Sequence, residues 1–240
     1  MSGGVAVLVP AWNEEGTVGD VVREIREALP GAAVVVIDDG SADDTAGAAR
    51  GAGAVVLRLP HNLGIGAAMQ TGYRYARERG FDAAVQVDGD GQHIPAEIPR
   101  LLEALREGAD LAVGSRFHER GDYRAPRARR FGILFFSLTV SLLTGRRFRD
   151  TTSGFRAANR RVIAFFSRHY PSDYPEPEAI LILSRAGYDV REVPARLRER
   201  GGGSSSITAI RGIYYMIKVF LALVMGTLRR TRNGGGGEER

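Results

Sequence analysis

The chain has 240 residues, 44% of them hydrophobic, and no cysteine, which allows one large domain or two small ones and excludes disulfides and thiolate metal sites. Its net charge is +5, its pI is about 9.9, and Lys218 is the only lysine, so nearly every cation is an arginine. Arginine binds phosphate through two parallel hydrogen bonds, so this excess indicates either a phosphate-bearing partner or a coding bias toward arginine.

The first 90 residues alternate between strand-like and helix-like patterns. An apolar run ending at Pro10 predicts a buried strand, and the segment after it carries apolar residues at helical spacing until Pro30. Further strands are predicted at 32–39, 55–60 and 83–90, with one helix beginning at Ser41 or nearby and another over 64–80. Four such alternations are typical of an α/β protein with a parallel sheet covered by helices.

A polar cluster follows each predicted strand. The four clusters read "PAWNEE" (10–15), "DDGS" (38–41), "HNLG" (61–64) and "DGDGQH" (88–93). In sheets of this kind ligands bind at the carboxyl ends of the strands. We therefore expect the four clusters to meet at one edge of the sheet.

After residue 110 the alternation loosens. One more strand is predicted at 110–117, followed by a basic, mobile segment at 118–130 and by two apolar stretches, 131–145 and 213–228, with arginines at their ends. Both stretches are shorter than the roughly 20 residues that a membrane-spanning helix needs. They fit helices lying in the head-group layer, although two core helices or an oligomer interface would also explain them.

Asp88 and Asp90 are the candidate metal ligands. In an extended segment they point to the same side, with Gly89 between them, and Gln92 follows with the same parity. Mg²⁺ and Mn²⁺ prefer hard oxygen ligands of this kind. A calcium loop is excluded because its sixth and twelfth positions would be His93 and Pro99, but a plain polar turn remains an alternative.

The other clusters exclude two nucleotide-binding classes. "HNLGIGAA" lacks the third glycine of a dinucleotide site, and no phosphate-binding lysine follows it, so a dehydrogenase and a P-loop enzyme are both disfavoured. A carboxylate of Asp38 or Asp39 would suit a base or a ribose, or would simply form a turn. A nucleic-acid-binding protein is disfavoured too, since the arginines flank apolar runs and no such motif is present.

Six segments occur in the order and spacing of family 2 glycosyltransferases. They read "VLVPAWNEEGTV", "VVVIDDGSADDT", "NLGIGAAMQTGYRYA", "QVDGDGQH", "GSRF" and "DTTSGFRAANRRV". The chain resembles this family over roughly residues 5–206, and within it the dolichol-phosphate mannose synthase branch, which makes polyprenyl phosphate sugars. The resemblance implies the GT-A fold, an α/β architecture with a mostly parallel sheet flanked by helices.

The resemblance also implies roles for individual residues. The donor nucleotide would be held by Pro10, Ala11, Trp12, Asn13, Glu14, Asp39, Gly66 and Asp88, and the divalent cation, Mg²⁺ or Mn²⁺, by Asp88, Asp90 and Gln92. The acceptor phosphate would be received by Ser115, Arg116, Arg129, Arg130, Ser153, Arg200 and Ser204. Asp90, Arg116, Asp150 and Arg156 would serve the reaction, with Asp150, Ser153 and Arg156 facing the sugar and the acceptor.

The acceptor decides whether the enzyme needs a base. A lipid phosphate is already anionic, whereas a sugar hydroxyl needs a carboxylate to take its proton, and Asp150, Glu176 and Glu178 are the carboxylates at hand. The basic run and the apolar stretches favour a lipid phosphate. We therefore expect an inverting hexosyl transfer from a GDP- or UDP-sugar to a polyprenyl phosphate. The alternatives are transfer to a glycan hydroxyl and a catalytically silent subunit that binds a nucleotide sugar.

The expected organisation has three parts: a GT-A domain at 1–206, an interface helix at 207–232 and a disordered tail at 233–240. The N-terminal run has no basic region and is too short for a signal peptide, so we expect a cytoplasmic protein bound peripherally to the inner membrane face. The expected partners are a nucleotide sugar, a polyprenyl phosphate and the membrane surface, with an integral membrane subunit as a further candidate and no nucleic acid.

Overall fold

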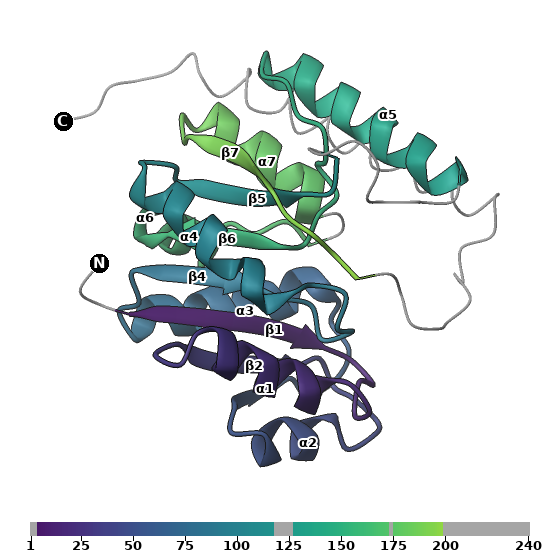
Figure 1. Cartoon of the computed structure of the whole chain (residues 1–240), viewed down its shortest axis with the longest axis vertical. Helices are drawn as coiled ribbons and strands as arrows, with labels where there is room; N and C mark the ends of the chain where they lie inside the picture. The colour runs from purple at the N-terminus through teal and green to yellow at the C-terminus, as the bar shows by residue number, and fades with distance from the viewer. Residues whose placement is uncertain (1–3, 118–126, 173–174, 199–240) are drawn as a thin grey trace.

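The computed structural model describes residues 4–117, 127–172 and 175–198, and within 127–131 it describes the backbone alone. A seven-stranded sheet runs through its centre in the order β3-β2-β1-β4-β6-β5-β7 (Figure 1). The strands are β1 (Val5–Ala11), β2 (Ala33–Asp38), β3 (Val55–Arg58), β4 (Ala83–Gln86), β5 (Leu111–Ser115), β6 (Arg156–Asn159) and β7 (Val190–Pro194). All are parallel except β6, which runs antiparallel to both of its neighbours. The four predicted strands of the first 90 residues are confirmed.

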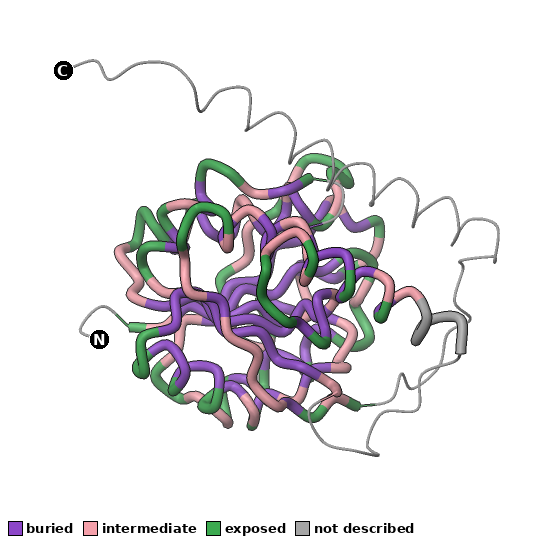
Figure 2. Tube along the Cα trace, turned by 90° about the horizontal axis from the view of Figure 1, so that it is seen from above, coloured by how far each residue is buried: buried purple, intermediate pink, exposed green. Residues whose placement is uncertain are grey.

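Helices cover both faces of the sheet. One face carries α1 (Val18–Ala28), α2 (Thr45–Gly51) and α4 (Ile98–Arg106), which follows the short helix η1 (Pro95–Glu97). The other carries α3 (Ile65–Glu78), α5 (Arg127–Thr144), α6 (Arg160–Phe166) and α7 (Pro175–Arg185). The strands form the buried centre between these two layers (Figure 2).

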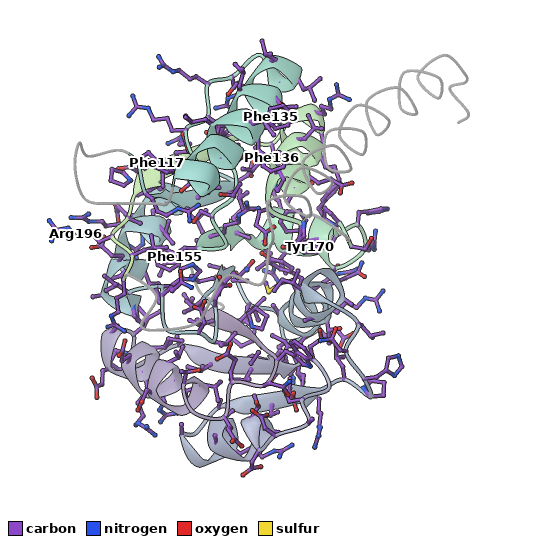
Figure 3. All side chains as sticks on the ribbon, turned by 90° about the vertical axis from the view of Figure 1, so that its right-hand side faces the viewer. Phe117, Phe135, Phe136, Phe155, Tyr170 and Arg196 are labelled. Atoms are coloured by element: carbon purple, nitrogen blue, oxygen red, sulfur yellow. The ribbon has the colours of Figure 1, made fainter. Side chains whose placement is uncertain are left out.

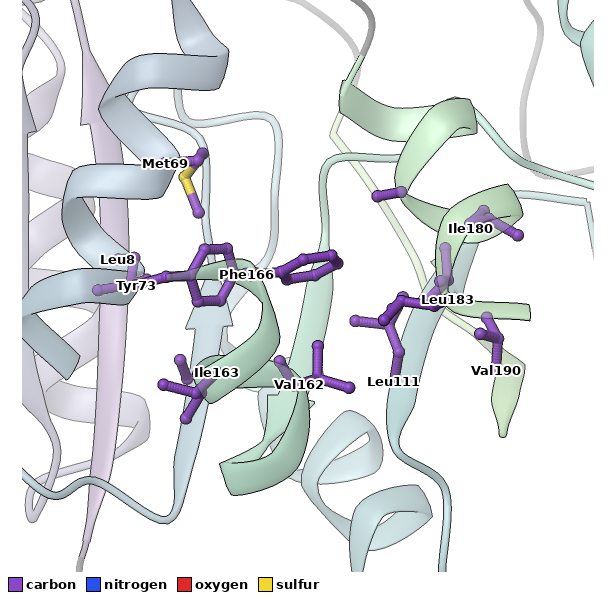
Figure 4. Packing of buried hydrophobic residues seen from close by; sticks show 14 of the residues in the cluster. Leu8, Met69, Tyr73, Leu111, Val162, Ile163, Phe166, Ile180, Leu183 and Val190 are labelled. Carbon is purple, nitrogen blue, oxygen red and sulfur yellow. The ribbon is translucent and has the colours of Figure 1, made fainter. Parts of the chain in front are cut away.

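The sheet strands are buried on both faces, which explains their nearly continuous apolar sequences. Leu8 and Leu111 of the sheet, Tyr73 of α3, Phe166 of α6 and Ile180 of α7 belong to one core cluster (Figure 4). The opposite core cluster is built from the apolar positions of α1 and α4. Helices α1, α3 and α4 therefore place their periodic apolar stripes against the sheet, whereas α5 packs on α7.

One predicted boundary is wrong, because α2 begins at Thr45 and not near Ser41. The backbone N–H of Ser41 donates to Asp38 Oδ1 at 2.9 Å, and that of Thr45 donates to Asp43 Oδ1 at 3.1 Å. Short polar side chains that bond nearby backbone groups compete with helix formation in this way. Residues 42–44 therefore form a bend, and the helix begins only after it.

Several predictions fall on parts of the chain that the structure does not describe. The segment 118–126, the stretch 213–228, the interface helix 207–232 and the tail 233–240 lie outside the described residues. The stretch 131–145 forms most of α5, which lies at the outer end of the molecule beyond β7 and α7 (Figure 1). No helix in the described part of the chain has the length and hydropathy needed to span a membrane.

Candidate active site

The polar clusters meet at one edge of the sheet, as predicted. Because β1 to β5 and β7 run in the same direction, their carboxyl ends share that edge. The antiparallel strand β6 begins there, at Arg156, and brings the loop 150–155 to the same place. Strand direction therefore positions every segment of the site.

The loops after β1 and β2 are joined by hydrogen bonds between side chains and backbone. Asn13 donates its backbone N–H to Ser41 Oγ at 2.9 Å, and its own Oδ1 accepts the N–H of Ala42 at 2.9 Å. Asn13 has a φ of 55°, a left-handed conformation that asparagine tolerates better than most residues. Glu14 donates its N–H to Thr45 Oγ1 at 2.8 Å. The motif "WNEE" is thus held rigidly against "DDGSADDT".

Four of the residues predicted to hold the nucleotide differ in their exposure and in their partners. Pro10 and Ala11 are buried at the end of β1, whereas the indole of Trp12 is 54% exposed beside them. Both carboxylate oxygens of Asp39 accept backbone N–H groups of the next loop, from Leu63 and Gly64, each at 2.8 Å. The exposed Trp12 is available for stacking, while Asp39 fixes the loop after β3.

Gly66, also predicted to line the donor site, packs against another loop. A Cβ there would lie 2.4 Å from the carbonyl oxygen of Pro171 and 2.5 Å from that of Ser172. The first turn of α3 therefore approaches the segment before α7 so closely that only glycine fits. A role in donor binding stays a prediction.

Asp88 lies in a cage of three residues. Its Oδ1 accepts a hydrogen bond from Gln86 Nε2 at 3.1 Å, and His93 Nε2 lies 3.5 Å from Oδ2. On a third side a Cβ at Gly154 would come within 2.9 Å of Oδ2. The side chain of Asp88 is still 36% exposed, so its carboxylate is held in place and also accessible.

The other two predicted metal ligands contact each other. Asp90 accepts the backbone N–H of Gln92 at 3.0 Å and also a hydrogen bond from the Gln92 side chain. Their loop is attached to the neighbouring one, because Thr17 Oγ1 donates to the carbonyl of Gly89 at 2.9 Å. Asp90 and Gln92 are thus in direct contact in the loop that contains Asp88, and a metal ion held by all three stays a prediction.

The oxygen atoms of Asp88, Asp90 and Gln92 suit Mg²⁺ or Mn²⁺ only if substrate phosphates and water supply the remaining ligands. Among the described residues no group of three or more His, Cys, Asp and Glu side chains could hold a metal ion. Two carboxylates and an amide oxygen are the usual protein contribution to a Mg²⁺ site whose other ligands are substrate phosphates and water. The residues therefore suit a cation that arrives with a diphosphate.

Asp150 and Arg116 form a buried ion pair. Arg116 donates from Nε to Asp150 Oδ2 and from Nη2 to Oδ1, both at 2.7 Å, and Asp150 is completely buried. The Asp150 N–H in turn donates to Glu192 Oε1 at 2.6 Å. The pair ties the end of β5 to the loop 150–155, so the structure gives both residues a strong structural role.

Arg156 is turned into the protein and is only 1% exposed. Its guanidinium donates to the backbone carbonyls of Thr151, Ser153 and Glu176 at distances of 3.2, 2.7 and 2.7 Å. Arg156 therefore braces the loop 150–155 against the start of α7, and its role toward the sugar and the acceptor stays a prediction.

The residues predicted to bind the acceptor phosphate are only partly described. Ser115 and Ser153 are buried at the same sheet edge, Ser115 with no partner for its Oγ among the described residues. Arg129 and Arg130 lie in the first turn of α5, but their side chains are outside the described part, as are Arg200 and Ser204 altogether. The structure therefore describes the predicted acceptor site only where its residues belong to the sheet edge.

Two site residues were missed by the sequence reasoning, Gln86 and Glu192, and Glu176 was considered only as a carboxylate that could act as a base. Gln86 had a signal, because it precedes Asp88 by two residues and so shares its side of the strand. Burial raises the pKa of Glu176, and the nearby Arg156 opposes that shift. Glu176 and Glu192 come from α7 and β7, whose positions next to the loop 150–155 depend on long-range strand pairing that no local pattern reveals.

Comparisons with known proteins agree with this geometry. The family model described as Glycosyl transferase family 2 matches residues 6–166. Polyprenol monophosphomannose synthase of Mycolicibacterium smegmatis is 32% identical over 94% of this chain and 89% of its own length. Undecaprenyl-phosphate mannosyltransferase of Micrococcus luteus is 32% identical over 85% and 87%, respectively.

Solved structures show the same fold. Glucosyl-3-phosphoglycerate synthase from Mycobacterium tuberculosis, crystallised with Mn²⁺, uridine diphosphate and phosphoglyceric acid, superposes with a TM-score of 0.69. The alignment covers 93% of this chain and 78% of that one at 22% identity. The GT-A fold predicted from the sequence motifs is thereby confirmed.

Proposed function

Because the chain belongs to glycosyl transferase family 2 and is a glycosyltransferase, we propose that it moves a hexose from a nucleotide sugar to a polyprenyl phosphate. The donor is a GDP- or UDP-sugar bound at the edge formed by β1, β2 and β4. Trp12 stacks on the base, and Asp88, Asp90 and Gln92 hold Mg²⁺ or Mn²⁺ with the diphosphate. The printed names of the relatives support the acceptor class.

The reaction exchanges one bond for another. An oxygen of the acceptor phosphate attacks the anomeric carbon, and the bond from that carbon to the diphosphate breaks. Attack from the side opposite the leaving group inverts the configuration. A bound divalent cation neutralises the negative charge that develops on the departing diphosphate. The residues of the chain hold both substrates in line, which accounts for a large part of the acceleration in such transfers.

One observation carries the choice of acceptor. Asp150, one of the three carboxylates considered as a base, is completely buried in its bidentate pair with Arg116 and is therefore a poor proton acceptor. A hydroxyl acceptor needs such a group, whereas a phosphate does not. The burial of Asp150 thus removes one of the bases that a glycan hydroxyl could use, which supports a lipid phosphate as the acceptor.

We also propose that α5 lies on the membrane that contains the acceptor. Leu134, Leu138 and Leu142 are 59%, 61% and 75% exposed and recur every four residues along one side of the helix. Arg146, Arg147 and Arg149 follow its end, where they can reach lipid phosphates. We therefore propose a peripheral protein at the membrane face where nucleotide sugars are available. An integral membrane subunit that anchors the enzyme or uses its product remains part of the proposal.

The proposal is tested by transfer of label into lipid. The protein is incubated with radiolabelled GDP- and UDP-sugars, Mn²⁺ or Mg²⁺ and polyprenyl phosphate, and the mixture is extracted with organic solvent. We expect label in the organic phase with at least one donor, and none with Asp90→Ala or in the presence of a chelator. Absence of lipid-soluble label with every donor would refute the proposed acceptor.

A further inference from the structure

His93 is buried between three segments of the site, and the proposed function gives it no task. It is 4% exposed, and its ring packs on Phe155 of the loop before β6 with the centroids 5.0 Å apart. Its backbone pairs with Leu197, in the segment that follows β7. Phe155 itself lies in the interior, between α5 and the β1 side of the sheet (Figure 3). Such burial fixes the ring in one orientation.

Both ring nitrogens of His93 face Asp88. Nδ1 accepts the backbone N–H of Asp88 at 3.0 Å, and Nε2 lies 3.5 Å from Asp88 Oδ2. Because Nδ1 accepts, it carries no proton, so the neutral ring has its proton on Nε2, toward the carboxylate. The same side chain therefore accepts a hydrogen bond from the backbone of Asp88 and lies beside its carboxylate.

We propose that His93 is a positioning residue that presents the Asp88 carboxylate to the divalent cation. Groups that orient a metal ligand without touching the metal commonly change metal affinity by about 10- to 100-fold. Gln86 holds the opposite oxygen of the same carboxylate, and the Gly154 backbone closes the third side. Among the described residues these neighbours flank the carboxylate, and its side chain is still 36% exposed, which leaves it accessible to a cation. The inference rests on the proposed function, because it concerns the same metal site.

The two contacts of the ring can be separated by substitution. His93→Asn keeps an acceptor near the position of Nδ1 and loses the group at Nε2, whereas His93→Gln keeps a donor near Nε2. His93→Phe keeps the ring packing on Phe155 and loses both polar contacts. His169→Asn is the matched control, since His169 is exposed and its ring packs on Phe165 of α6.

The measurement is Mn²⁺ affinity by electron paramagnetic resonance, with Mn²⁺ alone and with added GDP or UDP, together with thermal unfolding of each variant. We expect His93→Phe and His93→Asn to bind Mn²⁺ at least about 10-fold more weakly than the parent. His93→Gln should recover part of that loss, and His169→Asn should bind as the parent does. In turnover, the metal concentration for half-maximal rate should rise while the rate at saturating metal changes less.

Three results distinguish the possible failures. If folded His93→Phe and His93→Asn bind Mn²⁺ as tightly as the parent, the positioning role is refuted, even if both variants unfold at lower temperature. If the parent binds Mn²⁺ and His93 variants bind it weakly, but no sugar reaches a polyprenyl phosphate, the proposed acceptor fails and the inference on His93 stands. A parent that binds no Mn²⁺, with or without nucleoside diphosphate, overturns both.

Discussion

At the residue scale, the proposed metal site depends on Gly154, a glycine whose backbone conformation is open to other residues. A methyl group at Gly154 would lie 2.9 and 3.1 Å from the two carboxylate oxygens of Asp88 and 3.1 Å from Gln86 Nε2. Contacts below 3.0 Å force one partner to move. The glycine therefore leaves room for the Asp88 carboxylate rather than for a turn.

Gly154→Ala should consequently reduce glycosyl transfer by at least about 10-fold, the usual cost of disturbing a group that supports a metal ligand. Gly31→Ala is the control, because a Cβ there meets nothing within 4 Å. Gly31 precedes β2 and so lies at the amino ends of the strands, away from the site. Initial rates at saturating donor, with the unfolding temperature of each variant, make the comparison. Equal rates for the two variants would show that Asp88 does not need its present position.

Glu176 provides a prediction about pH. Burial raises its pKa above the ordinary value of 4.5, so the folded protein binds this proton more tightly than the unfolded chain does. Stability from such a group is fully present below the unfolded pKa and is lost as the pH rises through the folded pKa. Once the pH exceeds the folded pKa, the ionised carboxylate therefore lowers the free energy of unfolding.

Glu176→Gln should accordingly unfold at a higher temperature than the parent at pH 7–8, and the difference should shrink as the pH falls toward 4.5. Thermal unfolding of the two proteins across this range measures it. A constant difference at all pH values would mean that the substitution acts through packing and not through the charge.

At the element scale, the end of β5 and the loop before β6 are joined by one ion pair. Asp150 accepts three hydrogen bonds from Arg116, including one from its backbone N–H at 3.2 Å. Removing one partner of a buried pair leaves the other charge without compensation, which typically costs about 3–5 kcal/mol.

Asp150→Ala should therefore lower the free energy of unfolding by about 3–5 kcal/mol, as measured by urea denaturation. Asp20→Ala is the comparison, because Asp20 pairs with Arg23 on the exposed surface of α1, where such pairs contribute less than about 1 kcal/mol. A loss of activity at Asp150→Ala without a loss of stability would instead support a role as a base.

The exposed leucines of α5 provide a prediction about membranes. Replacing Leu138 and Leu142 by Asp should weaken binding to vesicles of anionic lipid by at least about 10-fold, because each buried leucine contributes about 1.5–3 kcal/mol. Val55→Asp, which changes an exposed apolar residue on the distant edge strand β3, should bind as the parent does. Co-sedimentation measures both, and unchanged binding of the α5 variant would remove α5 from the membrane contact.

At the scale of the whole molecule, the sequence predicted the first half of the fold better than the second. The strands up to Gln86 have apolar runs and alternate with helices, and β1, β2 and β3 pair in sequence order. The strand β6 has four residues, begins with a buried arginine and inserts between β4 and β5 in the opposite direction. No local periodicity marks such a strand.

The residues of the candidate site were likewise predictable only in part. Asp88, Asp90 and Gln92 were found because they are close in the chain and follow a strand. The residues that surround Asp88 could not be predicted in this way. Gly154 lies 66 positions away along the chain, and the ring of His93 is oriented by Phe155. Likewise the inward direction of Arg156 depends on carbonyls of two other segments. These contacts exist only once the sheet has formed.

The most direct test of the account is mass spectrometry of both products of a single reaction with an active donor and polyprenyl phosphate. Transfer of a hexose to the phosphate predicts a lipid that has gained one hexose and no phosphate, together with a released nucleoside diphosphate. A lipid that gained a hexose and a phosphate with release of a nucleoside monophosphate, or a sugar attached only to a glycan, would contradict it.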